Sequence, residues 1–412
     1  MKKNKSMLKG AIWNTLGSTM YGANSFFMLA LVSRIGTVEE AGFFGIAFTT
    51  AQLMYVIGLL GINNYQQTDY IEKYSFSVYV KTKIFSCVLM IAGCFLSIKL
   101  LNFSGAKAEY TIILTAFMML NAVGEMIQSL FFQKNRLDLS GSALFYRTFW
   151  SLIVFGLFVV ITRNILLSVS IQIIVNLVIT IYYTVRYVPR FTGGGIKKEE
   201  SNASVRLIME CFPLFVSVLI MNVVINTSKY GIEIFMDGTA QGYYNMIFMP
   251  AQVIHLCSQF IFKPLLNQYS TAFMDNRLSE AMSMMRKQVT MVIGFTSVCC
   301  VAAGLFGTQV LGFIYNKDLA EQRTALILVV AGGGIYAIDQ LLYFILVILR
   351  LQKKIMYTYL AGLAASVVLT GILVRHCGII GAVMSFVLTH GIIFTGYCLI
   401  LFAYLKRGRK DV

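Results

Sequence analysis

The sequence predicts an all-α integral membrane protein with about twelve transmembrane helices, arranged as two six-helix lobes of parallel repeats around a central cavity. Hydrophobic residues make up 58% of the 412 residues and charged residues only 13%, whereas a soluble protein has about 25% charged residues. Apolar runs of membrane-spanning length recur along the chain, and most basic residues lie in the short segments between them.

Twelve apolar runs are long enough to cross a membrane, since a spanning helix needs about 20 mostly apolar residues. These runs cover residues 10–33, 41–62, 78–99, 110–132, 144–162, 165–185, 207–229, 241–263, 287–312, 324–349, 355–375 and 379–404. The first run follows several lysines, as a signal peptide does, but it extends to Val32 without a cleavage motif. We therefore expect it to be a retained span.

The distribution of Lys and Arg predicts a multi-pass protein of the cytoplasmic membrane with both termini on the cytoplasmic side. Cytoplasmic loops carry an excess of bases, and of the 34 bases only eight fall in segments assigned to the outer side. Those eight are Arg34, Lys99, Lys107, Arg163, Lys229, Lys317, Arg323 and Arg375. The net charge of +16 then reflects topology and anionic lipid rather than nucleic acid.

One basic connector separates the two hydrophobic halves. Residues 186–206 (RYVPRFTGGGIKKEESNASVR) contain five bases and three consecutive glycines. We expect an N-lobe at 1–186 with spans one to six, a cytoplasmic linker at 187–206 and a C-lobe at 207–412.

An internal repeat supports this division. Residues 42–53 (GFFGIAFTTAQL) align with residues 242–253 (GYYNMIFMPAQV), with Gly, Phe, Ala and Gln identical. With six spans in each lobe, both halves enter the membrane in the same direction, so the repeats are parallel. The substrate path of such a protein is expected between the halves.

Polar side chains inside the apolar runs lie at helical spacing, on single helix faces. They form stripes at Asn14, Ser18 and Tyr21, at Asn222, Asn226, Lys229 and Glu233, and at Gln252, His255, Gln259 and Lys263. Polar residues in a membrane face a cavity or a partner helix. The stripes therefore either line a substrate cavity or form hydrogen bonds between helices.

Two carboxylates lie near the middle of apolar runs, Glu125 in the fourth and Asp339 in the tenth. A charge at mid-helix costs about 2.5–3.5 kcal/mol in a membrane, and a buried carboxylate either pairs with a base or takes up a proton. Both are candidates for ion coupling, with Glu233 as a third, and structural pairing is the alternative.

Several classes of protein are not expected. The eight cysteines form no CxxC pair and lie mostly inside apolar runs, which favours packing over metal binding or redox chemistry. The sequence has no Walker motif, so we do not expect ATP-driven transport. The outer loops are too short for a membrane enzyme such as a polysaccharide polymerase or ligase. We therefore expect neither an enzyme nor a metal, cofactor or nucleic-acid site.

Five segments resemble the polysaccharide biosynthesis flippases, which are O-antigen, capsule and teichoic-acid type exporters of the multidrug/oligosaccharidyl-lipid/polysaccharide exporter superfamily. Residues 34–44 (RIGTVEEAGFF) look like the family signature between its first two spans, and residues 133–143 (QKNRLDLSGSA) are similar to its loop after span four. Matching segments follow in order at residues 212–217 (FPLFVS), 242–244 (GYY) and 262–266 (FKPLL).

The resemblance implies a flippase for undecaprenyl-diphosphate-linked oligosaccharides, driven by H⁺ or Na⁺. Its partners would be membrane lipids, glycosyltransferases and a polysaccharide polymerase. A diphosphate needs cations, for which Arg34, Arg147, Lys229 and Lys263 are the candidates. Sugars need amides, hydroxyls and aromatic faces, which Asn14, Ser18, Tyr21, Asn222, Asn226, Gln252, His255 and Gln259 supply.

One position departs from the family, which often has an Asp-Arg pair late in span seven. This chain has Ser228 and Lys229 there, so a base is kept but an arginine is not. The alternative function is an ion-coupled multidrug exporter of the same superfamily, which would favour acidic, aromatic-lined pockets over paired bases.

Overall fold

The computed structural model describes residues 2–69, 71–192, 202–262, 265–275 and 277–408. All regular secondary structure in these ranges is helical. The chain divides into two compact units, Met1–Leu219 (unit 1) and Ile220–Val412 (unit 2).

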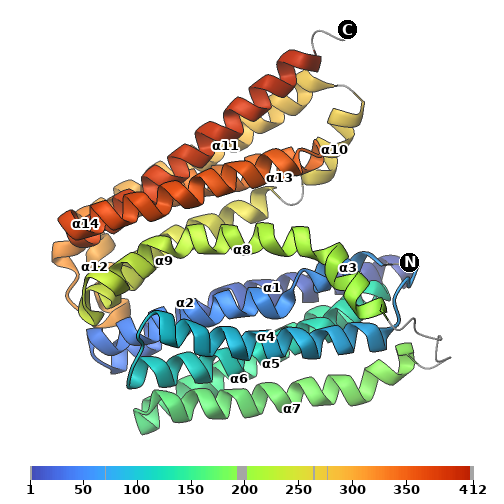
Figure 1. Ribbon diagram of the computed structural model, residues 1–412, viewed down its shortest axis with the longest axis horizontal. Helices are drawn as coiled ribbons and strands as arrows, with labels where there is room; N and C mark the ends of the chain where they lie inside the picture. Colours follow the sequence, from blue (N-terminus) through green and yellow to red (C-terminus); the bar gives the residue numbers. More distant parts are fainter. Residues whose placement is uncertain (1, 70, 193–201, 263–264, 276, 409–412) are drawn as a thin grey trace. The chain divides into compact units, whose positions relative to one another are not determined.

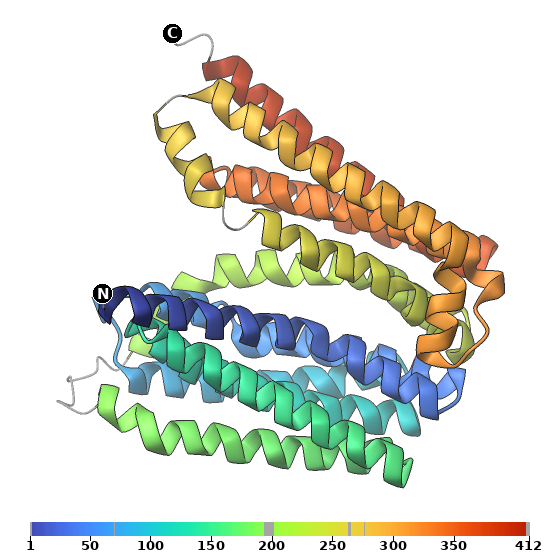
Figure 2. The same ribbon diagram turned by 180° about the vertical axis from the view of Figure 1, so that it is seen from behind.

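Unit 1 is a bundle of long helices in which chain neighbours run in opposite directions (Figure 1). α1 packs on α6, α2 packs on α5, and α7 packs on both α5 and α6. In Figure 2, α1, α6 and α7 lie side by side in this order. The helices are α1 (Lys2–Ile35), α2 (Val38–Leu59), α3 (Ile62–Thr68), α4 (Phe76–Leu100), α5 (Ala106–Gln133), α6 (Leu137–Thr162) and α7 (Ile165–Thr192), together with the first half of α8 (Ala203–Phe235), which continues into unit 2.

Unit 2 is organised around its most deeply buried long helix, α13, which packs against α9, α11 and α14 (Figure 1). A π-helical turn at Ala303–Gly307 joins α11 to α12 without a break. The helices are α9 (Gly238–Phe262), α10 (Leu266–Met274), α11 (Leu278–Ala302), α12 (Thr308–Tyr315), α13 (Arg323–Ile348) and α14 (Gln352–Gly408).

Local chemistry explains where several helices begin and end. Thr37 and Glu40 form a capping box at the start of α2, in which each side chain binds the other residue's backbone N–H. α2 ends at Leu59 because Leu60 and Gly61 adopt left-handed backbone conformations. The second span was predicted to continue to residue 62, so that boundary was three residues too long.

α14 consists of two helices that meet at Gly378, where φ is 56° and ψ is −131°. Glycine adopts such a conformation without the steric cost that a Cβ would bring. The two helices contain the predicted spans at 355–375 and 379–404.

The predicted fold class is confirmed. Among the described residues, nine helical segments have the length and hydropathy of membrane spans, and α14 is counted there as one segment. α1 and α9 are also long enough to cross a membrane, and each contains a predicted span. About twelve spanning helices follow, with six before the connector and six after it.

The boundary between the units falls inside α8. Leu207 and Cys211 belong to a hydrophobic cluster of unit 1 that includes Tyr79 of α4 and Phe131 of α5. The first half of α8 is therefore part of the core of unit 1. Of the predicted linker, residues 193–201 lie outside the described residues, and 187–192 continue α7.

Candidate functional site

Unit 1 contains a polar cluster formed by four helices, in which Arg147 is buried and Tyr21, Tyr55 and Glu125 are half-buried. The Tyr55 hydroxyl of α2 donates a hydrogen bond to the carboxylate of Glu125 on α5. The ring of Tyr21, on α1, lies 6.4 Å from that of Tyr55. Arg147 of α6 is close enough to Glu125, Tyr21 and Tyr55 for electrostatic interaction with all three.

Arg147 is 2% exposed, yet none of its three guanidinium nitrogens has a hydrogen-bond partner among the described residues. Its Nη1 lies against Gly124, where an added Cβ would come within 1.3 Å of that atom. The absence of a side chain at Gly124 therefore makes the room that the guanidinium occupies.

A small cavity adjoins the guanidinium. Its volume is about 10 Å³, close to the minimum that a single water molecule needs. The residues that line it are Gly124, Ile127, Gln128, Ala143, Arg147, Ile179, Thr180 and Tyr183. Arg147 therefore has space beside it for a small polar group.

Neutral hydrogen-bonding side chains extend from this cavity along α5, α6 and α7. Asn176 Nδ2 donates to Asn121 Oδ1 at 3.0 Å, and Thr180 Oγ1 donates to Asn176 Oδ1 at 3.3 Å. The Tyr183 hydroxyl donates to Ser142 Oγ at 3.2 Å. The interior of unit 1 thus combines a guanidinium that lacks hydrogen-bond partners among the described residues with amides, hydroxyls and aromatic rings.

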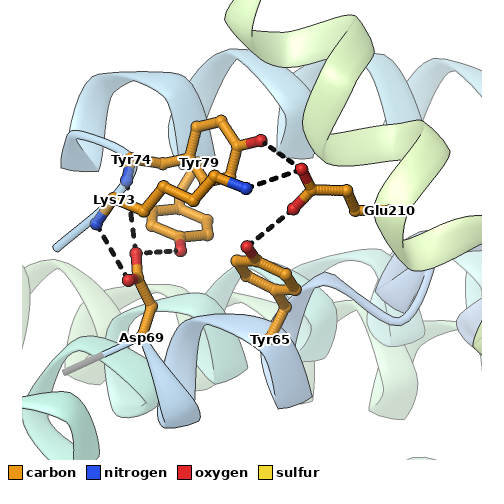
Figure 3. Close-up of polar contacts among 6 residues, drawn as sticks. All are labelled: Tyr65, Asp69, Lys73, Tyr74, Tyr79 and Glu210. Carbon is orange, nitrogen blue, oxygen red and sulfur yellow. Dashed lines mark hydrogen bonds and ion pairs between the residues drawn. The ribbon is translucent and has the colours of Figure 1, made fainter. Parts of the chain in front are cut away.

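A second polar cluster of unit 1 is built on Asp69, in the loop between α3 and α4 (Figure 3). Its carboxylate accepts bonds from the backbone N–H groups of Lys73 (2.9 Å) and Tyr74 (3.2 Å). It also accepts a bond from the Tyr79 hydroxyl at 2.9 Å. Asp69 therefore fixes the conformation of this loop.

The side chains of Tyr65, Lys73 and Tyr74 hold Glu210 of α8 (Figure 3). We call these four residues the α8 anchor. The Glu210 carboxylate accepts bonds from Tyr65 Oη at 2.6 Å, Lys73 Nζ at 2.7 Å and Tyr74 Oη at 3.1 Å.

The pKa values of Tyr65, Lys73 and Tyr74 in the α8 anchor are raised by burial or by the hydrogen bond to Glu210. Burial and the hydrogen bond to Glu210 raise the pKa of Tyr65 to about 12. The same carboxylate raises the pKa of Lys73 above its ordinary value. Both groups therefore keep their protons, and their bonds to Glu210, into the alkaline range.

Unit 2 contains a buried acid–base pair. Asp339 of α13 and His390 of α14 are 1% and 3% exposed, and Asp339 Oδ2 lies 2.8 Å from His390 Nδ1. The Tyr336 ring lies 4.8 Å from the His390 ring and stacks on that of His255 at 4.2 Å. Phe386 covers His390, with ring centroids 4.7 Å apart.

The polar stripes predicted for α8 and α9 have local partners in unit 2. Gln259 Nε2 donates to His255 Nε2 at 2.7 Å, and Asn226 Nδ2 donates to the backbone oxygen of Asn222 at 2.9 Å. Lys229 is buried, and its ammonium group lies 4.9 Å from the centre of the Phe248 ring. Hydrogen bonds within a helix and a cation–π contact thus account for part of these stripes.

The structure brings together some of the predicted site residues. Tyr21, Glu125 and Arg147 meet in unit 1. In unit 2, His255, to which Gln259 is hydrogen-bonded, stacks on the Tyr336 ring beside His390.

The other predicted residues lie apart from these clusters. Ser18 and Arg34 of α1 are exposed, and Asn14, Glu233 and Gln252 are half-buried. Lys263 lies outside the described residues.

Sequence reasoning missed the partners of both central carboxylates, Tyr55 and His390. The chain has only three histidines, and His390 lies in the middle of the last apolar run. That position was the available signal of a buried partner for Asp339. Within the described ranges, no group of three or more His, Cys, Asp and Glu side chains could hold a metal ion.

Comparison with solved structures identifies the fold. A multidrug resistance MATE family transporter of the MOP superfamily superposes with a TM-score of 0.74 at 10% identity, covering 94% of this chain and 96% of that one. The lipid II flippase MurJ superposes with 0.73 at 12% identity, covering 95% and 87%. A mutant of the Vibrio cholerae MATE transporter VcmN gives 0.62 at 14% identity, covering 97% of each chain.

No protein-family model and no curated protein matches the sequence. At identities this low, the structural likeness concerns the fold. The chain is a multi-pass membrane protein with the fold of the MOP-superfamily transporters.

Proposed function

We propose that the chain is a transporter that moves undecaprenyl-diphosphate-linked oligosaccharide repeat units across the cytoplasmic membrane for surface polysaccharide synthesis. Transport proceeds by ion-coupled alternating access, and the chain is not an enzyme. Both termini are cytoplasmic in this proposal, as the distribution of bases predicts. Glycosyltransferases supply the substrate and a polysaccharide polymerase uses it.

The observation that supports this proposal most is Arg147. Burial of a charged group costs several kcal/mol unless a partner compensates for it, and this guanidinium has no hydrogen-bond partner among the described residues. Guanidinium N–H groups bind phosphate oxygens in a bidentate manner. An anionic head group that reaches Arg147 would supply the missing acceptors.

The side chains around Arg147 carry groups that bind sugars, and the cavity of about 10 Å³ beside it would have to open to admit a head group. Asn121, Asn176 and Thr180 offer amide and hydroxyl groups, and Tyr183 adds an aromatic face. In this proposal the further head-group contacts come from the other predicted site residues, which are Arg34, Lys229, Lys263, Asn14, Ser18, Tyr21, Asn222, Asn226, Gln252, His255 and Gln259. Ion coupling is assigned to Glu125, Asp339 and Glu233.

Ion-coupled multidrug export is the second candidate function. A specific observation favours it, namely the buried carboxylate of Asp339 near the aromatic rings of Tyr336 and Phe386. Acidic, aromatic-lined sites suit cationic, apolar drugs. A drug-efflux assay with the Asp339→Asn variant separates the two functions. Loss of efflux with unchanged polysaccharide output would favour the multidrug exporter.

Deletion of the gene tests the proposed function directly. We expect surface polysaccharide to disappear and lipid-linked repeat units to accumulate on the cytoplasmic side, where chemical analysis would identify the sugar. Intact surface polysaccharide without such accumulation would contradict the proposal.

Complementation of the deletion strain then tests Arg147. The Arg147→Gln variant should fail to restore export although it reaches the membrane in normal amounts. Arg163→Gln is the matched control, because Arg163 is an exposed base at the end of α6. It should restore export fully.

A further inference from the structure

The buried pair in unit 2 has two polar atoms that lack partners. Besides the 2.8 Å contact between Asp339 Oδ2 and His390 Nδ1, the outer atoms of the pair are Asp339 Oδ1 and His390 Nε2. Neither of these two atoms has a hydrogen-bond partner within the described part of the chain. Buried polar atoms are normally satisfied, so these two are unusual.

The charge of the pair depends on one proton. With Nδ1–H donating to Oδ2, an ionised Asp339 and a neutral His390 carry a net charge of −1. Addition of one proton to Asp339 Oδ1 or to His390 Nε2 forms a new O–H or N–H bond and makes the pair neutral. Those are the two atoms without partners, and a low-dielectric site favours the neutral state.

The pair has no directly contacting cation among the described residues, and the buried ammonium of Lys229 lies beyond the rings of Phe248 and Phe386. The titratable groups that act on Asp339 are His390, Tyr359, Tyr397 and Cys398 on α14 and Tyr336 on α13, and His255 on α9 reaches it through the Tyr336 ring. Among the described residues, no Lys or Arg forms a salt bridge with Asp339. The compensating charge therefore comes from a proton or from another cation.

A proton fits the pair better than a metal cation. Hard metal cations such as Ca²⁺ and Mg²⁺ take six or more oxygen ligands, whereas the hydrogen-bond partner of the carboxylate among the described residues is an imidazole nitrogen. Histidine is the side chain that ordinarily exchanges its proton near neutral pH.

We propose that Asp339 and His390 form one proton-binding unit, which takes up and releases one proton in each cycle and makes H⁺ the coupling ion. The coupling role rests on the transport function proposed above, but proton binding by the pair does not.

The first experiment needs no substrate. NMR spectra of the protein in lipid nanodiscs, with ¹⁵N-labelled histidine, contain signals from only three histidines, which single His→Gln variants assign. In the wild type, we expect the His390 signals to change with pH in one step. In the Asp339→Asn variant, the His390 signals should differ from those of the wild type at every pH. The exposed His376 should not respond to Asp339→Asn. Identical His390 signals in the wild type and in Asp339→Asn would overturn the pair.

The second experiment measures transport of the lipid-linked oligosaccharide in proteoliposomes under a pH gradient or a Na⁺ gradient. A pH gradient should stimulate the wild type and the His376→Gln control, and this stimulation should be lost in both Asp339→Asn and His390→Gln. Equal stimulation by Na⁺ without a pH gradient, or full stimulation of His390→Gln, would overturn the coupling role.

The two experiments separate the two proposals. If the wild type does not transport the oligosaccharide under either gradient, the proposed function fails. The histidine spectra alone then decide whether Asp339 and His390 bind the proton together.

Discussion

In unit 1 the central buried base is Arg147, which has no hydrogen-bond partner among the described residues, whereas in unit 2 the central buried acid, Asp339, is held by His390. Each unit buries charge in a helical core, but a different ligand can complete each site. The guanidinium of unit 1 lacks acceptors and suits an anion. The acid–base pair of unit 2 can be neutralised by one proton.

The comparison shows why the same kind of substitution should have different effects in the two units. Removal of one partner from a buried pair leaves an uncompensated charge and is strongly destabilising. Arg147 has no hydrogen bond to lose among the described residues, so its removal costs its electrostatic attraction to Glu125 and relieves its own desolvation penalty. Stability should therefore depend on the pair in unit 2, and function on the base in unit 1.

The largest expected loss of stability follows His390→Leu, which leaves the Asp339 carboxylate without its base. The free energy of unfolding, measured by denaturant titration in detergent, should fall by about 3–5 kcal/mol. The matched control is His376→Leu at an exposed position, where we expect a change within about 0.5 kcal/mol. Equal stabilities of the two variants would mean that His390 does not stabilise the buried Asp339 carboxylate.

A smaller change in stability but a large loss of export is expected for Gly124→Ala. The new Cβ displaces the guanidinium of Arg147, at an overpacking cost of about 1–3 kcal/mol, which the higher helix propensity of Ala offsets by about 1 kcal/mol. Export in complemented cells should fall at least tenfold.

The control for this prediction is Gly294→Ala in α11, where a Cβ would have no neighbouring atom within 4 Å. Its export should equal that of the wild type. Normal export by the Gly124→Ala variant would show that the position of the guanidinium is not important.

The smallest expected effect concerns the α8 anchor and its pH dependence. Because the pKa of Lys73 is raised by Glu210, its unprotonated, reactive amine should form at a higher pH than in an ordinary exposed lysine. The contribution of Lys73 to stability is present below its unfolded-state pKa and is lost as pH rises through the folded value. Mass spectrometry after acylation at a series of pH values should show Lys73 reacting later than the exposed Lys353.

In the Glu210→Gln variant the difference between Lys73 and Lys353 should disappear. If Lys73 in the wild type reacts in parallel with Lys353 throughout the series, Glu210 does not hold the lysine, and α8 is fixed to unit 1 by its apolar contacts alone.

The fold could be predicted from the sequence because each membrane span is a local signal of length and hydropathy. Contacts inside one helix were equally accessible, as Asn222 and Asn226 illustrate. Contacts between residues of different helices could not be predicted from the sequence in this way. Asp339 and His390 are 51 residues apart, and their meeting depends on the packing of α13 on α14, which spacing along one helix does not specify.

The boundary of the units was hidden for a similar reason. The connector at 186–206 stands out by composition, but the first half of α8 belongs to unit 1 because Leu207, Cys211 and Glu210 all have partners there. Those partners lie on α3, α4 and α5 and in the loop after α3, far earlier in the chain. Tertiary packing therefore places the boundary beyond the point where the polarity of the sequence changes.

The affinity of the purified protein for a polyprenyl diphosphate, compared between the wild type and Arg147→Met, tests whether Arg147 binds the head group. A charge-assisted hydrogen bond contributes about 1.5–3 kcal/mol, and each 1.4 kcal/mol is about tenfold in affinity. Arg147→Met should therefore bind at least about tenfold more weakly, with an unchanged or higher free energy of unfolding, and Arg163→Met should bind as the wild type does. Arg147→Met protein that binds the diphosphate as tightly as the wild type would contradict the account.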